Sequence, residues 1–252
     1  RDEWVAQVKA TDAPLVVSLS GRDIPSCQNL IRAFDALGVD AYEINISCAH
    51  SGALHGNLNV DTEHLAHVLS AVRGITTTPL WIKLSYSLHV VAMAREAERL
   101  GADAIVCTNA IGPGLLLDVE TSRPKLGIKG GAGGMSGKAI FPIALRCVYE
   151  ISQAVNIPVV GVGGISCPND ALQMLMAGAS AVQLYTYPAL RGYVSTAIQC
   201  PDGCIPRRRS WHAIKECAYT LLPFTAPSVR YSCFMLYAKD ESVVGNSCLD
   251  RC

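Results

Sequence analysis

Six short apolar segments, spaced along the first three quarters of the chain, constrain its fold more than any other feature. Each is nearly continuously apolar rather than alternating, as expected of strands that are buried on both faces of a sheet. Polar or glycine-rich stretches and amphipathic helical patterns separate them. The predicted strands are residues 15–20, 41–47, 80–85, 104–109, 159–164 and 181–186. Strands that alternate with helices predict an α/β fold with a parallel sheet.

The ends of the predicted helices support these parallel β/α units. Three helices end at a glycine, and the next strand begins within three residues of Gly38, Gly101 and Gly178. Glycine readily adopts the left-handed conformation that ends a helix, so the connection to the next strand can be short. At the other end of the first such helix, Ser26 is the predicted N-terminal cap.

Glycines and a threonine at the last two predicted strands favour a closed TIM (β/α)8 barrel over an open sheet. Gly163 and Gly164 end one strand, and Thr186 ends the next. Such barrels often bind a phosphate between the loops after strands seven and eight, where glycine N–H groups can approach it. The alternative is that the glycines only turn the chain. If these strands are the seventh and eighth, the chain contains six barrel strands and lacks the first two.

Polar side chains stand at the carboxyl ends of other predicted strands, where α/β enzymes bind their ligands. Asn45 and Asn109 can face the polar edge of a planar ligand. Cys48 can act as a nucleophile, acid or base, or it can be a small buried thiol under a loop. Lys83 lies within an apolar strand, so we expect its ammonium in the mouth of the barrel, although a lysine near a strand end can also reach solvent.

The composition excludes several classes of partner. The 252 residues carry 21 basic and 21 acidic side chains, and a net charge of zero gives no reason to expect nucleic acid or an anionic membrane. No apolar run is long enough to span a bilayer. The 11 cysteines include several scattered singly through the apolar region, which favours a reducing, cytoplasmic setting over a disulfide framework.

The β/α pattern stops near residue 192, which divides the chain into two parts. We expect a barrel domain over residues 1–192 and an atypical Cys-rich tail, disordered or altered, over residues 193–252. The cysteines of the tail form no compact set of four, so no metal site is predicted. They are Cys200, Cys204, Cys217, Cys233, Cys248 and Cys252.

Seven motifs occur in the order that is typical of one enzyme family. They are E-I-N-I-S-C at 43–48, W-I-K-L at 81–84, T-N at 108–109, G-G-M-S-G-K-A-I at 133–140, P-I-A-L-R at 142–146, G-V-G-G-I at 161–165 and Q-L-Y-T at 183–186. With these motifs the sequence resembles the class-one, FMN-dependent dihydroorotate dehydrogenases and the pyrimidine-reducing domain of dihydropyrimidine dehydrogenase.

The resemblance implies an oxidoreductase that holds FMN in the mouth of the barrel and interconverts a dihydropyrimidine and a pyrimidine. Cys48 matches the position of the acid or base at C5, while a hydride passes between C6 and flavin N5. The favoured reaction is oxidation of dihydroorotate to orotate in pyrimidine biosynthesis. The other implied contacts are those of Asn45, His50 and Asn109 with the substrate, and of Lys83, Gly137, Gly163, Gly164, Tyr185 and Thr186 with FMN.

Departures from the family pattern leave alternatives open. The usual Cys-Pro-Asn is Cys48-Ala49-His50 here, and dihydropyrimidine dehydrogenases have Cys-Pro-His, so a subunit that acts on uracil or thymine is one alternative. The missing strands motivate another, a truncated relative without catalytic activity. A third is a barrel with a phosphate site but no flavin, as in a phosphosugar isomerase. By family analogy we expect a homodimer and an iron–sulfur or flavin partner for electron transfer.

Overall fold

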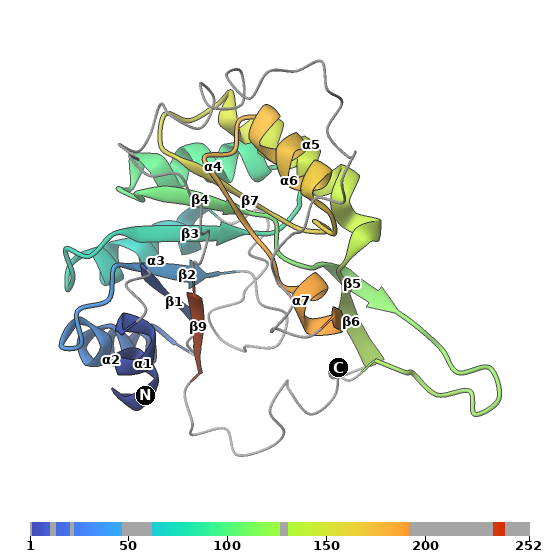
Figure 1. The fold of residues 1–252 in the computed structure, drawn as a ribbon, viewed down its shortest axis with the longest axis horizontal. Helices are drawn as coiled ribbons and strands as arrows, with labels where there is room; N and C mark the ends of the chain where they lie inside the picture. Colours follow the sequence, from blue (N-terminus) through green and yellow to red (C-terminus); the bar gives the residue numbers. More distant parts are fainter. Residues whose placement is uncertain are drawn as a thin grey trace.

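A seven-stranded sheet with parallel pairings forms the centre of the molecule (Figure 1). The computed structural model describes residues 2–10, 14–20, 23–46, 62–126, 131–191 and 234–239. The strands lie in the order β8-β7-β4-β3-β2-β1-β9. Their bounds are β1 Leu15–Ser20, β2 Ala41–Asn45, β3 Leu80–Leu84, β4 Ala104–Cys107, β7 Val159–Val162, β8 Ala181–Gln183 and β9 Phe234–Lys239.

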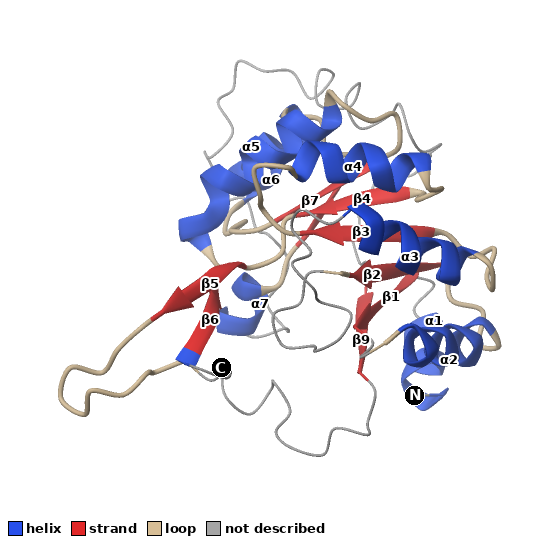
Figure 2. Cartoon of the chain, turned by 180° about the vertical axis from the view of Figure 1, so that it is seen from behind, coloured by secondary structure: helices blue, strands red, loops and turns tan. Residues whose placement is uncertain are grey.

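Helices cover one face of this sheet (Figures 1 and 2). Their apolar stripes pack against alternate strand residues in one large core, to which α2 contributes Ile31 and Phe34, and α3 contributes Leu65 and Leu69. No helix in the described ranges is both long and apolar enough to cross a membrane. The bounds are α1 Asp2–Lys9, α2 Ile24–Asp35, α3 Thr62–Arg73, α4 Val90–Arg99, α5 Phe141–Ser152, α6 Pro168–Met176 and α7 Thr186–Arg191, with a 3-10 turn, η2, at Lys138–Ile140.

The cap of α2 differs from the prediction. Asp23, not Ser26, is the N-cap residue, because its carboxylate oxygen Oδ1 accepts a hydrogen bond of 2.8 Å from the Ser26 backbone N–H. Pro25 occupies the first turn, where it needs no N–H partner. An aspartate before a proline was therefore the stronger signal for the start of this helix.

The sheet is curled, as a hydrogen bond across its inner face demonstrates. Gln183 on β8 donates from Nε2 to Glu43 Oε2 on β2 at 3.0 Å. Three strands separate β8 from β2 in the sheet. In a flat sheet these two strands would lie about 19 Å apart, since neighbouring strands are spaced by about 4.8 Å. The side chains meet only because the sheet bends into part of a barrel, which confirms the predicted α/β class and incomplete barrel.

Several strands end two or three residues earlier than predicted, because their last residues leave the regular ladder. Residues 108 and 109 follow β4 after a cis peptide bond between Cys107 and Thr108. The Thr108 N–H donates to Val162 O at 2.7 Å, and the Asn109 N–H donates to Leu84 O at 3.0 Å. The polar residues at this strand end are thus attached to both neighbouring strands.

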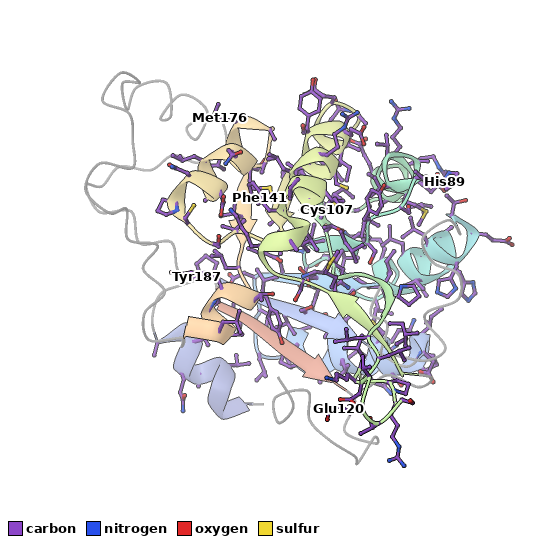
Figure 3. The ribbon with its side chains drawn as sticks, turned by 90° about the vertical axis from the view of Figure 1, so that its right-hand side faces the viewer. His89, Cys107, Glu120, Phe141, Met176 and Tyr187 are labelled. Carbon is purple, nitrogen blue, oxygen red and sulfur yellow. The ribbon has the colours of Figure 1, made fainter. Side chains whose placement is uncertain are left out.

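An antiparallel hairpin of β5 (Ile111–Leu115) and β6 (Ala132–Met135) extends from the body as an arm (Figures 1 and 2). Glu120, in the connection between the two strands, lies well away from Phe141 and Cys107 of the body (Figure 3). The arm exposes a series of large apolar side chains, namely Leu115, Leu116, Leu117, Val119 and Met135. These side chains form an exposed apolar patch on a two-stranded hairpin, an element that is only marginally stable by itself.

The seventh strand, β9, comes from the region predicted as an atypical tail. It pairs in parallel with β1 from Leu15↔Phe234 to Ser20↔Lys239, and so covers the edge of the sheet beyond β1. The division of the chain at residue 192 stays a prediction.

Candidate active site

Two asparagines meet at the carboxyl ends of the strands. Asn45 is the last residue of β2, and Asn109 follows β4 by two residues. The Asn109 side chain donates from Nδ2 to Asn45 Oδ1 at 3.0 Å, and its own Oδ1 accepts a hydrogen bond of 2.9 Å from the Ala110 N–H. These bonds fix both amide planes at the edge of the sheet where a ligand would bind.

Lys83 points into the interior of the curled sheet and not to solvent. Its side chain is 13% exposed, and Nζ lies 3.2 Å from Glu43 Oε1. A third member of this group is Gln183, whose Oε1 lies 3.4 Å from the same ammonium. The sequence reasoning assigned no role to Glu43 or Gln183. A signal was available for Glu43, because it lies two residues before Asn45 and therefore on the same face of β2.

Three glycines and a threonine form a second group, which we call the glycine cradle: Gly137, Gly163, Gly164 and Thr186. The three glycines have positive φ angles of 80°, 123° and 72°. A Cβ on Gly164 would lie 2.8 Å from Gly137 O, and a Cβ on Gly137 would lie 3.3 Å from Thr186 Cγ2. Segments from three different loops are therefore in contact here. The Thr186 hydroxyl also donates to Ser136 Oγ at 3.1 Å.

Thr108 adds a group that the sequence reasoning did not select. Its side chain is 2% exposed, and its hydroxyl oxygen has no hydrogen-bond partner among the described residues. It lies next to the cradle, since a Cβ on Gly163 would come 3.4 Å from Thr108 Cγ2. Buried hydroxyls without a partner are uncommon and costly, so this one is a ready hydrogen-bonding group for a ligand.

Three further residues were predicted for the site. Tyr185 precedes α7 and is 61% exposed. Cys48 and His50 lie outside the described residues, although they follow β2 by only a few positions in the sequence. Their predicted roles stay predictions.

A buried carboxylate anchors the loop that follows the two cradle glycines Gly163 and Gly164. Asp170 is 3% exposed and accepts hydrogen bonds from the Ser166 N–H and hydroxyl, both at 2.9 Å, and from the Cys167 N–H at 3.2 Å. The Lys138 ammonium, next to Gly137 in the sequence, lies 2.6 Å from its Oδ1. Burial alone would raise the pKa of Asp170, but the bonds from Lys138, Ser166 and Cys167 outweigh it and hold the pKa below its ordinary value.

We expect Asp170→Asn to lower the free energy of unfolding at pH 7 by about 1–3 kcal/mol, the cost of weakening hydrogen bonds to a buried charge. Because the folded pKa is depressed, this contribution is present above the unfolded pKa of about 3.9 and is lost as the pH falls through the folded value. Urea unfolding between pH 7 and pH 3 should show the variant and the parent converging at the acid end. Glu63→Gln, which removes an exposed carboxylate on α3, is the control. A difference that does not change with pH would refute this account.

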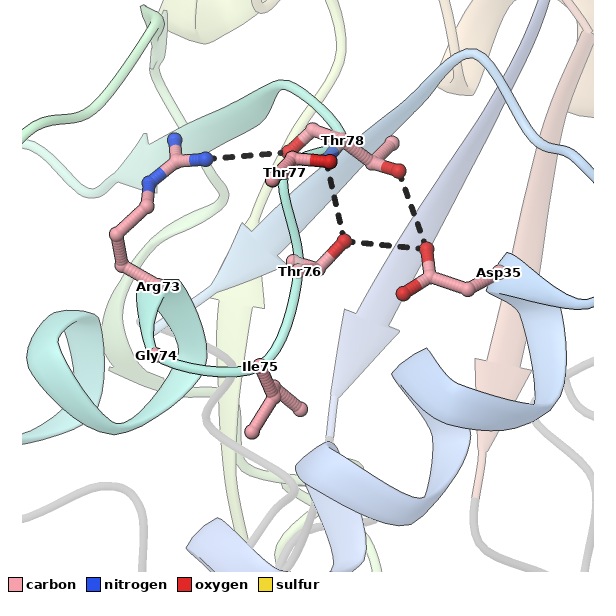
Figure 4. Close-up of a pocket in the computed structure, with 7 residues that line it drawn as sticks. All are labelled: Asp35, Arg73, Gly74, Ile75, Thr76, Thr77 and Thr78. Atoms are coloured by element: carbon pink, nitrogen blue, oxygen red, sulfur yellow. Dashed lines mark hydrogen bonds between the residues drawn. The ribbon is translucent and has the colours of Figure 1, made fainter.

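A surface cavity of about 530 Å³ lies at the opposite, amino-terminal end of the strands (Figure 4). Thr76 and Thr78, just before β3, both donate to Asp35 Oδ1 at 3.1 Å, and Arg73 donates to Thr78 O at 3.3 Å. These polar groups of the cavity wall are thus hydrogen-bonded to one another. Among the described residues, no three His, Cys, Asp or Glu side chains gather where they could bind a metal.

Comparison with known proteins identifies the family to which this chain belongs. The model of the family described as dihydroorotate dehydrogenase matches residues 2–199. The chain is 36% identical over 175 residues to the dihydroorotate dehydrogenase B (NAD(+)) catalytic subunit of Methanosarcina mazei. The aligned residues cover 69% of this chain and 55% of that protein. The subunit of the same name from Anoxybacillus flavithermus is 36% identical over 204 residues, which cover 79% of this chain and 61% of that protein. The chain thus spans little more than half the length of these relatives.

A solved structure supports the fold. The crystal structure of DHODH from Eimeria tenella, in complex with ferulenol, superposes with a TM-score of 0.53 at 22% identity, covering 67% of this chain and 50% of that one.

Proposed function

The chain belongs to the dihydroorotate dehydrogenase family, and we propose that it is an FMN-dependent oxidoreductase that converts dihydroorotate to orotate. The observation that carries this proposal is that the amide pair, the Lys83 ammonium and the glycine cradle all belong to the carboxyl-end side of one curled sheet. A barrel enzyme places a planar substrate and a phosphate-bearing cofactor at this side.

The described residues fit FMN in two respects. The cradle glycines bring three backbone segments into close contact, and N–H groups of glycine-rich backbone of this kind suit a phosphate, to which Thr186 adds a hydroxyl. The buried Thr108 hydroxyl next to the cradle has hydrogen-bonding capacity to offer. In our proposal Gly137, Gly163, Gly164, Tyr185 and Thr186 hold the phosphate end. Lys83 presents its charge to the ring.

FMN, when bound, supplies the hydride acceptor for C6 of the dihydropyrimidine ring. In our proposal Asn45, Asn109 and His50 orient the substrate ring through its polar edge. Cys48 removes the proton from C5, so the thiolate is the base and the thiol is its product. In the reducing direction the same thiol returns the proton.

The visible spectrum of the purified chain tests this proposal. We expect a flavin spectrum that dihydroorotate bleaches in the absence of oxygen. Bleaching by dihydrouracil and not by dihydroorotate would instead favour a dihydropyrimidine dehydrogenase-type subunit. A colourless protein that added FMN does not restore would overturn the proposal and support a non-catalytic relative.

We also propose the assembly that family analogy implies. The relatives' names, which contain "catalytic subunit" and NAD(+), support a separate iron–sulfur or flavin subunit as the electron-transfer partner. The exposed leucines of the β5–β6 arm support a homodimer. The described thiols of Cys27, Cys107, Cys147 and Cys167 are all free, in keeping with a cytoplasmic location.

A further inference from the structure

Glu43 is a fully buried acidic residue to which the proposed function gives no role. It lies in the middle of β2, is 0% exposed, and faces the interior of the curled sheet together with Asn45. Burying a carboxylate inside an apolar sheet is costly unless charged and hydrogen-bonding partners surround it. Its partners therefore indicate why this position holds a glutamate.

Three strands supply those partners, and we call the group the interior cluster: Ser18, Glu43, Lys83 and Gln183. The Ser18 hydroxyl on β1 donates to Glu43 Oε1 at 2.7 Å. The Lys83 ammonium on β3 lies 3.2 Å from Oε1 and 3.4 Å from Oε2. Gln183 on β8 donates to Oε2 at 3.0 Å and accepts from Lys83 at 3.4 Å. Glutamate, lysine and glutamine thus each contact the other two.

This arrangement restrains a side chain that is otherwise free to move. A lysine has four rotatable bonds, and its ammonium is a point charge without directional preference. Two anionic oxygens and one amide oxygen on one side of Lys83 limit the positions of its ammonium. Ser18 and Gln183 in turn fix the carboxylate, because each occupies one of its oxygens. Supporting hydrogen bonds of this kind keep functional groups within the narrow range that chemistry needs.

We propose that Glu43 is a positioning residue, which acts through Lys83 by holding its ammonium where the flavin ring binds. This inference rests on the proposed function, in which Lys83 contacts FMN. The position of the Lys83 ammonium also depends on the curl of the sheet. Only in a curled sheet can Gln183, 140 residues further along the chain on β8, donate its hydrogen bond to Glu43. The position of the charge is then a property of the barrel and not of β3 alone.

The midpoint potential of the bound flavin distinguishes positioning from a plain charge effect. Lys83→Met removes a positive charge and should lower the potential, because a nearby cation favours the reduced, anionic ring. If Glu43 positions Lys83, then Glu43→Gln lowers the potential toward the Lys83→Met value, and FMN binds at least tenfold more weakly. Removal of a negative charge alone would raise the potential. A rise, or no change, overturns the proposal. Glu63→Gln, an exposed glutamate on α3, is the matched control and should leave both quantities unchanged.

A second measurement needs no flavin. In urea unfolding, Glu43→Gln and Lys83→Met each leave one buried partner uncompensated, so the double variant should lose less stability than the two single losses combined. We expect a coupling of at least fivefold in the unfolding equilibrium constant. A coupling near unity overturns the proposal that Glu43 positions the Lys83 ammonium. If the unmodified chain does not bind FMN, the proposed function fails, and this cycle alone decides whether Glu43 fixes Lys83.

Discussion

Gly164→Ala is expected to abolish FMN binding and to destabilise the chain more than any other single methyl group added to the cradle. The new Cβ would lie 2.7 Å from Phe141 N and 2.8 Å from Gly137 O, which are backbone atoms that cannot rotate away. Overpacking of this kind costs about 1–3 kcal/mol. The φ of +72° adds about 1–2 kcal/mol for a residue with a side chain. Relief of the overlap requires Gly137 to move, which opens the cradle.

Gly101→Ala is the control that separates the two costs. Gly101 also has a positive φ, +87°, but nothing lies within 4 Å of an added Cβ. This variant should lose only the backbone part, about 1–2 kcal/mol, and keep its affinity for FMN. Urea unfolding and titration of FMN fluorescence would measure both effects. Equal FMN affinity in the two variants would show that the cradle does not hold the cofactor.

Cys48→Ala is expected to slow the oxidation of dihydroorotate by about 10²–10⁴-fold, the usual contribution of one positioned acid or base. The loss should fall on the proton-transfer step and leave FMN bound. Single-turnover bleaching of the flavin without oxygen measures this step independently of any electron acceptor. Cys48→Ser keeps a hydroxyl but is a much weaker acid than a thiol, so it should recover part of the rate only at high pH.

Cys167→Ala provides the control, because Cys167 is a free, exposed cysteine at the start of α6. It should bleach at the parental rate. If Cys48→Ala also bleached at the parental rate, Cys48 would have no part in the proton transfer.

The sequence was informative wherever the position of a residue along a strand determines where it lies. Asn45 and Asn109 each follow a buried run, so their meeting at one edge of the sheet could be predicted from the parallel order alone. The glycine pair at 163–164 and Thr186 likewise follow two consecutive strands of the predicted barrel, and they lie around one cradle.

The remaining features depend on packing that a linear pattern does not contain. The contact between Glu43 and Gln183 requires the curvature of the sheet, which no local periodicity specifies. Thr108 is buried next to Gly163, a neighbour more than 50 residues away in the sequence. β5 contains Gly-Pro-Gly, and both residue types are depleted in strands, so its pairing with β6 follows from tertiary context and not from propensity.

The pairing of β1 with β9 also affects the order in which the chain can fold. Leu15 of β1 pairs with Phe234 of β9, so among the described strand pairings this one has the largest sequence separation. Loop-closure entropy makes such contacts late to form. Until β9 arrives, the outer edge of β1 presents a row of unpaired N–H and C=O groups, which another nascent chain can pair with. Correct assembly of this sheet therefore depends on a kinetic competition between closure within one chain and association between two.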